Sequence, residues 1–477
     1  MIRTLVVALF ALTLVACSAP VTVPAQDSIG ARIARIENGL VPVVHIVGDD
    51  PVTFNLEDRL EEFGIPGMSV AFVEDGEISW SKAWGMADVA SGRPMDVDTL
   101  LLAGSISKPV AAIRALQLAE NGVFDLDEDV NRYLKSWQLP ENEFTSKEKV
   151  TIRRILNHTA GLTVWGFPGY DKGDDVPTVI EVLDGLGNTD PVRVFQEPGK
   201  AWLYSGGGTT IMQLAITDQE GLSFPDTMQA HVLDPMRMPG STFENPLPEE
   251  YHSIAATGYR INGDEVEGKW PIYPEMAAAG LWTKPSELIQ YAIEIQRIHQ
   301  TGEDGVLRHD TVVEMLSPGL ESFGLGPMID EFTFSHGGAD EGFRAHLVAW
   351  KDQPYAVVAM VNSDNGRILR EFLLSVAREY DLRGIEQEIR EVADMQAEQM
   401  SRFEGRYEMP EYETFNVRLV GDRLEMKSGS FDPPLLVLPQ SSNEFFSVTD
   451  GEIVTFDVDG DEVLGFEVWG LRAERVN

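Results

Sequence analysis

The stretch 105-SISKPVAAIRALQLAENG-122 predicts a helix that brings a serine and a lysine together at its start. Apolar residues recur at helical spacing, and Asn121-Gly122 is a typical helix end. Proline lacks an N–H group and is tolerated only in the first turn of a helix, so Pro109 fixes the helix start near Ser105. Residues three apart share one helix face, so we expect Ser105 and Lys108 to be neighbours.

Two interpretations of this helix start are open. In the first, Ser105 is a helix cap and Lys108 is a solvated surface residue. In the second, Ser105 is a nucleophile, because N–H groups at a helix start favour developing negative charge and a desolvated lysine can accept a proton. Ser-x-x-Lys alone is common by chance. The choice therefore depends on other parts of the chain.

Two later stretches, 197-EPGKAWLYSGGGTTIMQLA-215 and 332-FTFSHGGADEGFRAHLVAW-350, carry candidate functional residues. In the first, Tyr204 precedes three glycines that open a predicted helix; such a start can hold an anion, but no phosphate-loop pattern is present. In the second, His336-Gly337-Gly338 lies where glycines let another chain or a ligand approach the backbone closely. Taken singly, this tyrosine and this histidine are better explained by packing.

Taken together and in this order, Ser105-x-x-Lys108, Tyr204-Ser205 and His336-x-Gly338 resemble the serine β-lactamase and penicillin-binding protein superfamily. The likeness is greatest to class C-type β-lactamases, D-alanyl-D-alanine carboxypeptidases, D-aminopeptidases and related esterases, and it spans roughly residues 30–385. Five further stretches are similar to the family: IPGMSVAFVEDGEISWSKAWGMAD (65–88), LAENGVFDLDEDVNRYL (118–134), TIRRILNHTAGL (151–162), AAAGLWTKPSELIQYA (277–292) and FGLGPM (323–328).

The resemblance implies a role for each matching residue. Ser105 would be the nucleophile that becomes acylated, with Lys108 beside it. Tyr204 would be the general base, its phenolate favoured by the nearby ammonium. The oxyanion hole would consist of the backbone N–H groups of Ser105 and Ala339. Acylation followed by hydrolysis would make a two-step acyl transfer, with no cofactor and no metal.

Two departures from the family pattern concern substrate binding. Gly206 stands where the family usually has asparagine, and His336 stands where it often has lysine. With Gly338, these positions are the expected substrate contacts. Hydrogen bonds to charged groups are worth about 1.5–3 kcal/mol. The absence of the asparagine amide and of the lysine ammonium therefore weakens the case for recognition of β-lactams or D-Ala-D-Ala. We expect hydrolysis of an ester or amide, with a D-amino-acid peptide as one option.

Two alternatives to this hydrolase remain open. One is a β-lactamase or D-alanyl-D-alanine carboxypeptidase. The other, of a different class, is a penicillin-binding or sensor protein that is acylated but does not turn over. Three further residues are expected to be structural: Ser107, His158 and His346. No set of histidines and carboxylates has metal-ligand spacing.

The charge of the chain limits its partners. With 37 basic and 77 acidic residues, the net charge is -40. Such a field repels phosphate backbones and anionic lipid, so we expect no nucleic-acid partner. The family resemblance implies a substrate that is a small molecule or peptide.

The first 29 residues indicate export. Residues 1–16 have an early arginine and a short apolar run, typical of a signal peptide. Leu14-Val15-Ala16-Cys17 resembles a bacterial lipobox, and Cys17 is the only cysteine of the chain. We therefore expect a lipoprotein on a Cys17 anchor, held by a tether over 17–29 and exposed to the periplasm. A plain signal peptide with an incidental cysteine is the alternative.

Two folded domains follow. Strand patterns near both ends of 30–395 enclose a helical middle, which predicts an α+β domain with one antiparallel sheet, flanking helices and a helical subdomain. A polar helix is expected over 385–403. From 400 to 477 short strands alternate with Asp-Gly turns, which predicts a small antiparallel β-barrel of lipocalin type. The acidic run 457–461 fits a hairpin turn better than a calcium loop.

Overall fold

The computed structural model describes residues 28–409, 413–428, 434–468 and 471–476. The predicted leader, the lipidation site Cys17 and most of the predicted tether lie outside these residues. Within them, no helix is both long enough and apolar enough to cross a membrane. The first described helix, α1 (Ile29–Glu37), begins with Ser28 as its N-cap.

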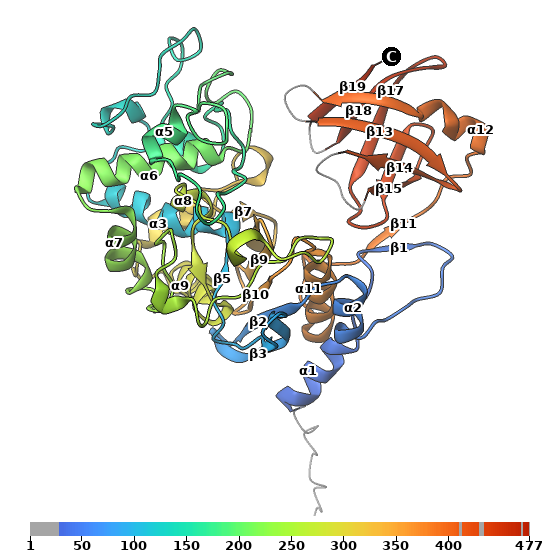
Figure 1. The fold of residues 1–477 in the computed structure, drawn as a ribbon, viewed down its shortest axis with the longest axis horizontal. Coiled ribbons are helices and arrows are strands. Elements are labelled where there is room, and N and C mark those ends of the chain that lie inside the picture. The colour runs from blue at the N-terminus through green and yellow to red at the C-terminus, as the bar shows by residue number, and fades with distance from the viewer. Residues whose placement is uncertain (1–27, 410–412, 429–433, 469–470, 477) are drawn as a thin grey trace, which may run out of the picture.

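The larger domain is built on one antiparallel sheet of seven strands, as predicted (Figure 1). The strand order is β4-β3-β2-β10-β9-β8-β7, so strands from both ends of the domain meet at the β2–β10 pair. The tight turn between β2 and β3 falls at Asp75-Gly76. The strands are β2 (Gly67–Glu74), β3 (Glu77–Asp88), β4 (Arg93–Pro94), β7 (Met328–Ile329), β8 (Thr333–Asp340), β9 (Phe343–Trp350) and β10 (Ala356–Val361).

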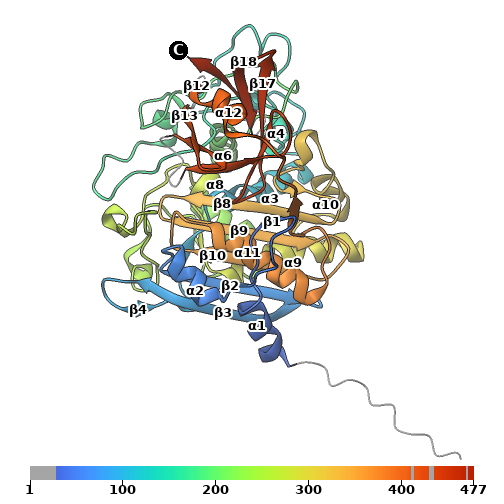
Figure 2. The same cartoon turned by 90° about the vertical axis from the view of Figure 1, so that its right-hand side faces the viewer.

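Helices cover both faces of this sheet, which makes the domain α+β (Figures 1 and 2). α1, α2 (Leu56–Glu62) and α11 (Arg367–Tyr380) pack on one face, and the helical subdomain packs on the other. Its helices are α3 (Ser107–Glu120), α4 (Ile152–Leu156), α5 (Val179–Leu183), α6 (Gly206–Glu220), α7 (Phe224–Met228), α8 (Met276–Ala279), α9 (Pro285–Thr301) and α10 (His309–Met315).

The central strand β10 is buried on both faces. All six of its residues are apolar, and successive side chains of a strand point to opposite faces. Accordingly, Ala356, Val358 and Met360 join the core under the helical subdomain, while Val357, Ala359 and Val361 join the core under α1, α2 and α11.

The smaller domain is a closed eight-stranded barrel, β12–β19, which confirms the predicted barrel fold. Aromatic rings in mutual contact fill its interior, among them Phe403, Tyr407, Phe445 and Phe456. The strands are β12 (Gly405–Met409), β13 (Glu413–Val420), β14 (Arg423–Lys427), β15 (Leu435–Pro439), β16 (Glu444–Ser447), β17 (Ile453–Asp459), β18 (Glu462–Val468) and β19 (Leu471–Val476).

The predicted polar helix over 385–403 is wrong for most of its length. Residues Glu388–Arg390 form strand β11, which pairs in parallel with β1 (Val44–Ile46). Helix is confined to α12 (Ala397–Met400) and the 3-10 turn that follows it, η7 (Ser401–Phe403). Pairing with β1 satisfies backbone groups of this segment, and tertiary context of this kind overrides helix propensity. The segment connects the two domains, and buried Leu438 and Phe446 of the barrel also join the core under α11.

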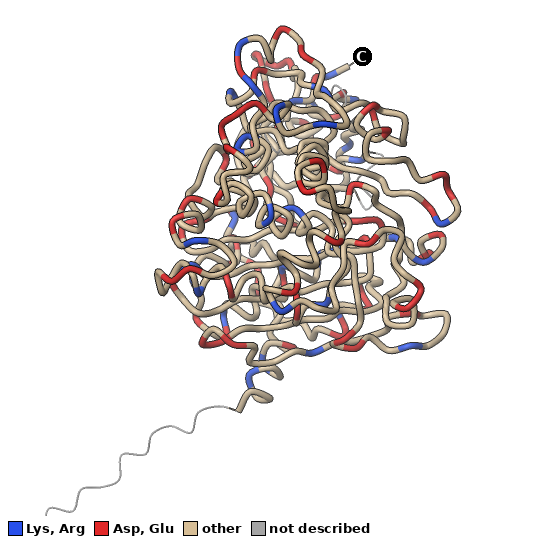
Figure 3. Tube along the Cα trace, turned by 90° about the vertical axis from the view of Figure 1, so that its left-hand side faces the viewer, with Lys and Arg blue, Asp and Glu red and all other residues tan. Residues whose placement is uncertain are grey.

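Charged residues are spread over both domains. Figure 3 shows acidic segments interspersed with fewer basic ones along the part of the chain that the structure describes. The acidic run 457–461 lies at the β17–β18 hairpin, where Asp457 pairs with Arg472 at 2.7 Å.

Candidate active site

Ser105 and Lys108 lie together at the start of α3. Ser105 belongs to a single 3-10 turn, η1 (Gly104–Ile106), that leads directly into the helix. The N-cap of α3 is Ile106, which makes no side-chain capping bond. The Lys108 ammonium is buried and donates to Ser105 Oγ at 3.0 Å and to the Ala278 carbonyl oxygen at 2.8 Å. The interpretation as a helix cap and a surface lysine is therefore wrong.

Ser107 has a structural position, as expected. Its hydroxyl is fully buried and donates to the Gly104 carbonyl at 2.6 Å. The same oxygen accepts the Leu281 N–H at 3.0 Å. These bonds attach the start of α3 to the segment that follows α8, and they hold Ser105 in its turn.

Tyr204 lies against the Lys108 ammonium, although 96 residues separate them in the chain. The Lys108 Nζ atom is 4.9 Å from the centre of the tyrosine ring. Ser205, the next residue, caps α6 by accepting the Gly208 N–H at 2.9 Å. The Tyr204 hydroxyl is buried and has no hydrogen-bond partner among the described residues.

The His158 ring packs against the ring of Tyr204. The two ring centres are 4.2 Å apart, and His158 Nδ1 accepts the Ser205 N–H at 3.2 Å. Burial, with a smaller effect from Lys108, holds the pKa of His158 well below its usual value, so the ring is neutral. This position agrees with the expected loop-shaping role.

His336 lies on β8, and its ring is near that of Tyr204. Its ring centre is 6.3 Å from that of Tyr204. Burial, and then the Lys108 charge, lower the pKa of His336 to about 3, so it is neutral at physiological pH. Nδ1 lies 2.6 Å from the Gly337 carbonyl oxygen and must donate to it, which leaves Nε2 as a buried acceptor without a partner among the described residues.

The edge of β8 presents an N–H group beside Ser105. The β8–β9 hairpin closes at the pair Asp340–Phe343 over a two-residue loop, so the next pair, Ala339–Arg344, is non-hydrogen-bonded and its N–H groups point away from the partner strand. A Cβ atom placed on Gly104 would lie 2.4 Å from Ala339 N. The Ala339 N–H therefore faces the turn that holds Ser105.

Two buried carboxyl groups near the site escaped the sequence analysis. Asp340 is two residues beyond Gly338, and burial raises its pKa to about 8 against the opposing charge of Lys108. Glu275 precedes α8, is fully buried, and has its pKa raised by burial to about 7. Residues two apart on a strand point to the same face, so the position of Asp340 two residues after Gly338 was the sequence signal that could have identified it.

Gly206 begins α6 under an aromatic side chain. A Cβ atom at this position would lie 2.9 Å from Phe167 Cε2 and 3.1 Å from the Trp165 carbonyl oxygen. The space into which a side chain at residue 206 would extend is thus filled by Phe167.

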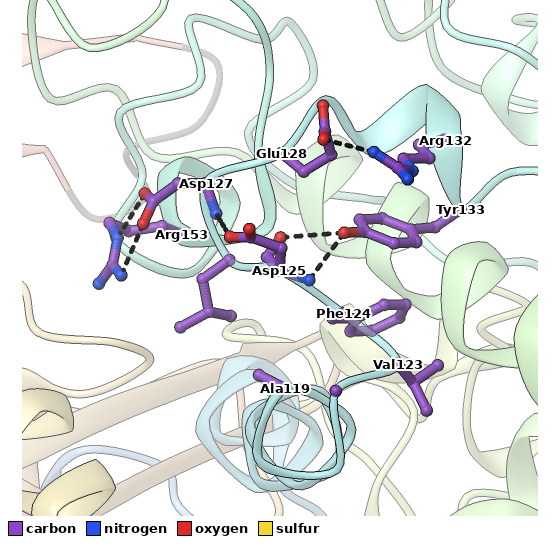
Figure 4. Close-up of a pocket in the computed structure, with 11 residues that line it drawn as sticks. Ala119, Val123, Phe124, Asp125, Asp127, Glu128, Arg132, Tyr133 and Arg153 are labelled. Atoms are coloured by element: carbon purple, nitrogen blue, oxygen red, sulfur yellow. Dashed lines mark hydrogen bonds and ion pairs between the residues drawn. The ribbon is translucent and has the colours of Figure 1, made fainter.

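A pocket at the C-terminal end of α3 is separate from the site around Ser105 (Figure 4). The helix is 14 residues long, so about 20 Å separate this pocket from Ser105. Four of its charged groups form two ion pairs: Arg153 binds Asp127 at 2.7 Å and Arg132 binds Glu128 at 2.6 Å. No group of three or more histidine, cysteine or acidic residues suited to a metal occurs in the described part of the chain.

Comparison with known proteins places this geometry in context. The sequence model of the family described as Beta-lactamase matches residues 54–375. Penicillin-binding protein 4* of Bacillus subtilis is 28% identical over 173 residues, which are 36% of each chain. Esterase EstB of Burkholderia gladioli is 28% identical over 224 residues, 42% of this chain and 56% of that one. The matched region thus spans about a third to a half of these relatives.

A solved structure extends the likeness to the fold. The octameric penicillin-binding protein homologue from Pyrococcus abyssi superposes with a TM-score of 0.62 at 19% identity. The match covers 88% of this chain and 98% of that one.

Proposed function

The chain belongs to the β-lactamase family, and from this premise we propose that it is a serine hydrolase that forms an acyl-enzyme on Ser105 and hydrolyses an ester. One observation carries the proposal: the buried Lys108 ammonium lies 3.0 Å from Ser105 Oγ and against the Tyr204 ring. Lys108 is buried and forms no ion pair within 4.0 Å among the described residues. Burial of an ammonium without an ion pair costs free energy, so chemistry at Ser105 explains this lysine better than stability does.

Acylation uses Ser105 and Tyr204. Because Lys108 donates a hydrogen bond to Ser105 Oγ, the proton of the serine must pass to another group, and we assign Tyr204 as the general base that receives it. Ser105 Oγ then attacks the ester carbonyl, and the N–H groups of Ser105 and Ala339 stabilise the oxyanion. The carbonyl–oxygen bond to the alcohol breaks, the alcohol leaves with the proton held by Tyr204, and the acyl group stays on Ser105.

Hydrolysis reverses these steps with water as nucleophile. Tyr204 takes a proton from water, the hydroxide attacks the acyl carbonyl, and the bond to Ser105 Oγ breaks. Ser105 recovers its proton from Tyr204, and the carboxylic acid leaves. His336 Nε2, a buried acceptor without a partner among the described residues, is available to accept a hydrogen bond from a hydroxyl of the substrate.

The charges of the site favour a substrate without a carboxylate. His336 is neutral, and the Lys108 ammonium is already bound to Ser105 and Ala278. Arg344 donates to Asp364 at 3.1 Å and to two carbonyl oxygens. Asp340 and Glu275, whose pKa values burial raises to about 8 and about 7, add no positive charge to this region. These observations support an ester over a β-lactam or a D-Ala-D-Ala peptide, both of which carry a carboxylate.

We also propose that the hydrolase is an exported lipoprotein anchored through Cys17. Metabolic labelling with a palmitate analogue tests the anchor. We expect label on the natural chain and none on the Cys17→Ser variant. Label that persists in the variant would contradict this anchor.

The test of the hydrolase compares the purified protein with its Ser105→Ala variant. Both are incubated with p-nitrophenyl esters, a chromogenic cephalosporin and D-alanyl peptides, and acyl adducts are sought by mass spectrometry. We expect ester turnover and a Ser105 adduct in the natural protein only. Cephalosporin or peptide turnover would favour the alternative enzymes, a persistent adduct would favour a sensor, and activity in the variant would exclude Ser105 as nucleophile.

A further inference from the structure

Residues 163–169 cross the start of α6, close to Tyr204. Gly206 N donates to the Trp165 carbonyl at 3.0 Å, and Gly207 N donates to the Val164 carbonyl at 2.9 Å. The Ser205 hydroxyl adds a bond to the Thr163 carbonyl at 3.0 Å. This end of the segment is therefore fixed to the residues that immediately follow Tyr204.

The other end of the segment is fixed near β8. The Tyr273 hydroxyl lies 3.4 Å from the Pro168 carbonyl oxygen and accepts the Glu341 N–H at 3.2 Å. Glu341 is two residues from Ala339, whose N–H faces Ser105. The segment therefore bridges the Tyr204 side and the Ala339 side of the reacting centre.

The segment holds a strained residue and displays aromatic rings. Val164 has a φ of 64°, a conformation that a β-branched side chain adopts only when its surroundings enforce it. Just after it, Trp165 is 63% exposed and Phe167 lies 2.9 Å from the position of a Cβ at Gly206. Backbone strain of this kind is concentrated in segments that bind ligands. The exposed tryptophan provides an apolar surface against which a ligand can pack.

We propose that Trp165 and Phe167 form an aromatic ledge that binds an apolar, uncharged group of the ester. The inference rests on the proposed function. Phe167 occupies the place of an amide-bearing side chain at residue 206, so the ledge offers ring surface where a hydrogen-bonding group would otherwise stand. Burial of apolar substrate area against these rings then strengthens binding with each added methylene.

The experiment uses the full chain and two series of esters. One series lengthens the acyl group from p-nitrophenyl acetate to the hexanoate, and the other lengthens the alcohol from methyl to hexyl acetate. We expect kcat/KM to rise at least 10-fold along one of the series, which also identifies the group that the ledge binds. In that series, Phe167→Ala should reduce the ratio of long to short ester at least 5-fold, whereas Phe167→Leu should keep it.

Two readouts separate this inference from the proposed function. Labelling of Ser105 by a small fluorophosphonate tests the nucleophile and should persist in Phe167→Ala. If the fluorophosphonate does not label Ser105 of the natural protein, the proposed function is overturned, and the ledge with it. If Ser105 is labelled but kcat/KM does not depend on chain length in either series, the ledge alone is overturned. The same conclusion follows if Phe167→Ala keeps the natural ratio of kcat/KM for the long and the short ester. Should Phe167→Ala not fold, Phe167→Leu against Phe167→Gln makes the same comparison.

Discussion

Gly338 of β8 lies so close to Ala103 that a Cβ atom on Gly338 would stand 2.0 Å from the Ala103 carbonyl oxygen. This contact sets the spacing between β8 and the turn that carries Ser105. A methyl group added to Gly338 would therefore push β8 away from this turn and move the Ala339 N–H away from Ser105. A change of about 1 Å at a reacting centre can cost about 100-fold in rate.

The first prediction follows from that contact. Gly338→Ala should lower kcat for an ester at least 100-fold, because the oxyanion donor moves while the nucleophile stays in place. Its matched control is the neighbouring Gly337→Ala, where the added Cβ meets no atom within 4 Å. Steady-state kinetics with p-nitrophenyl butyrate measure both variants. Equal activity in the two would contradict the assigned role of the β8 edge.

The second prediction concerns Lys108. Lys108→Met keeps the length of the side chain but removes its bonds to Ser105 Oγ and the Ala278 carbonyl. We expect kcat to fall by about 10³-fold, because the variant loses the ammonium that lies beside Ser105 Oγ and the Tyr204 ring. Lys147→Met, which removes an exposed pair with Glu197 at 3.3 Å, is the control and should leave kcat unchanged. A Lys108→Met variant with more than a tenth of the natural rate would remove Lys108 from the mechanism.

Local patterns explain how much of the site the sequence could predict. Pro109 and Asn121-Gly122 mark the two ends of α3, and the 3-10 turn that leads into the helix keeps Ser105 beside Lys108, so this pair follows from local geometry. The approach of Tyr204 and His336 needs contacts over about 100 and 230 residues, which periodicity does not encode; the order of motifs in a known family supplied it. Phe167 over Gly206 has no such pattern, because it depends on the path of an irregular segment.

The segment between the domains shows the same limit. Residues 385–403 have a polar, helix-forming composition, yet Glu388–Arg390 form a strand because β1 lies beside them. That partner is more than 340 residues away in the chain, so no local signal announces it. Composition predicts helix here, and tertiary pairing decides otherwise.

The third prediction is a pH dependence of stability from Asp340. Its carboxyl has a pKa near 3.8 when unfolded and about 8 when folded, so between these values the folded chain holds a proton that the unfolded chain lacks. The contribution of Asp340 to stability is therefore greatest at low pH and declines as pH rises through this window, by about 1.4 kcal/mol per pH unit.

Asp340→Asn should remove that decline. Denaturant unfolding from pH 4.5 to 7.5 should show the free energy of unfolding of the variant rising relative to the natural protein as pH increases. The exposed Glu331→Gln change serves as the control and should run parallel to the natural protein. A constant difference between Asp340→Asn and the natural protein would mean that Asp340 is ionised in the folded chain throughout this range.

The last prediction concerns the neutral His336. If the absence of a fixed cation at this position is what disfavours substrates with a carboxylate, His336→Lys should raise the rate of Ser105 acylation by a penicillin. A hydrogen bond to a charged group is worth about 1.5–3 kcal/mol, so the gain should be about 10-fold or more. The new ammonium would lie in a buried place near Lys108, so the variant should also unfold at a lower temperature. His336→Asn, neutral and polar, is the control and should show no gain in acylation, which mass spectrometry can follow. A stable, folded His336→Lys variant without faster acylation would instead place the discrimination at Gly206 and Phe167.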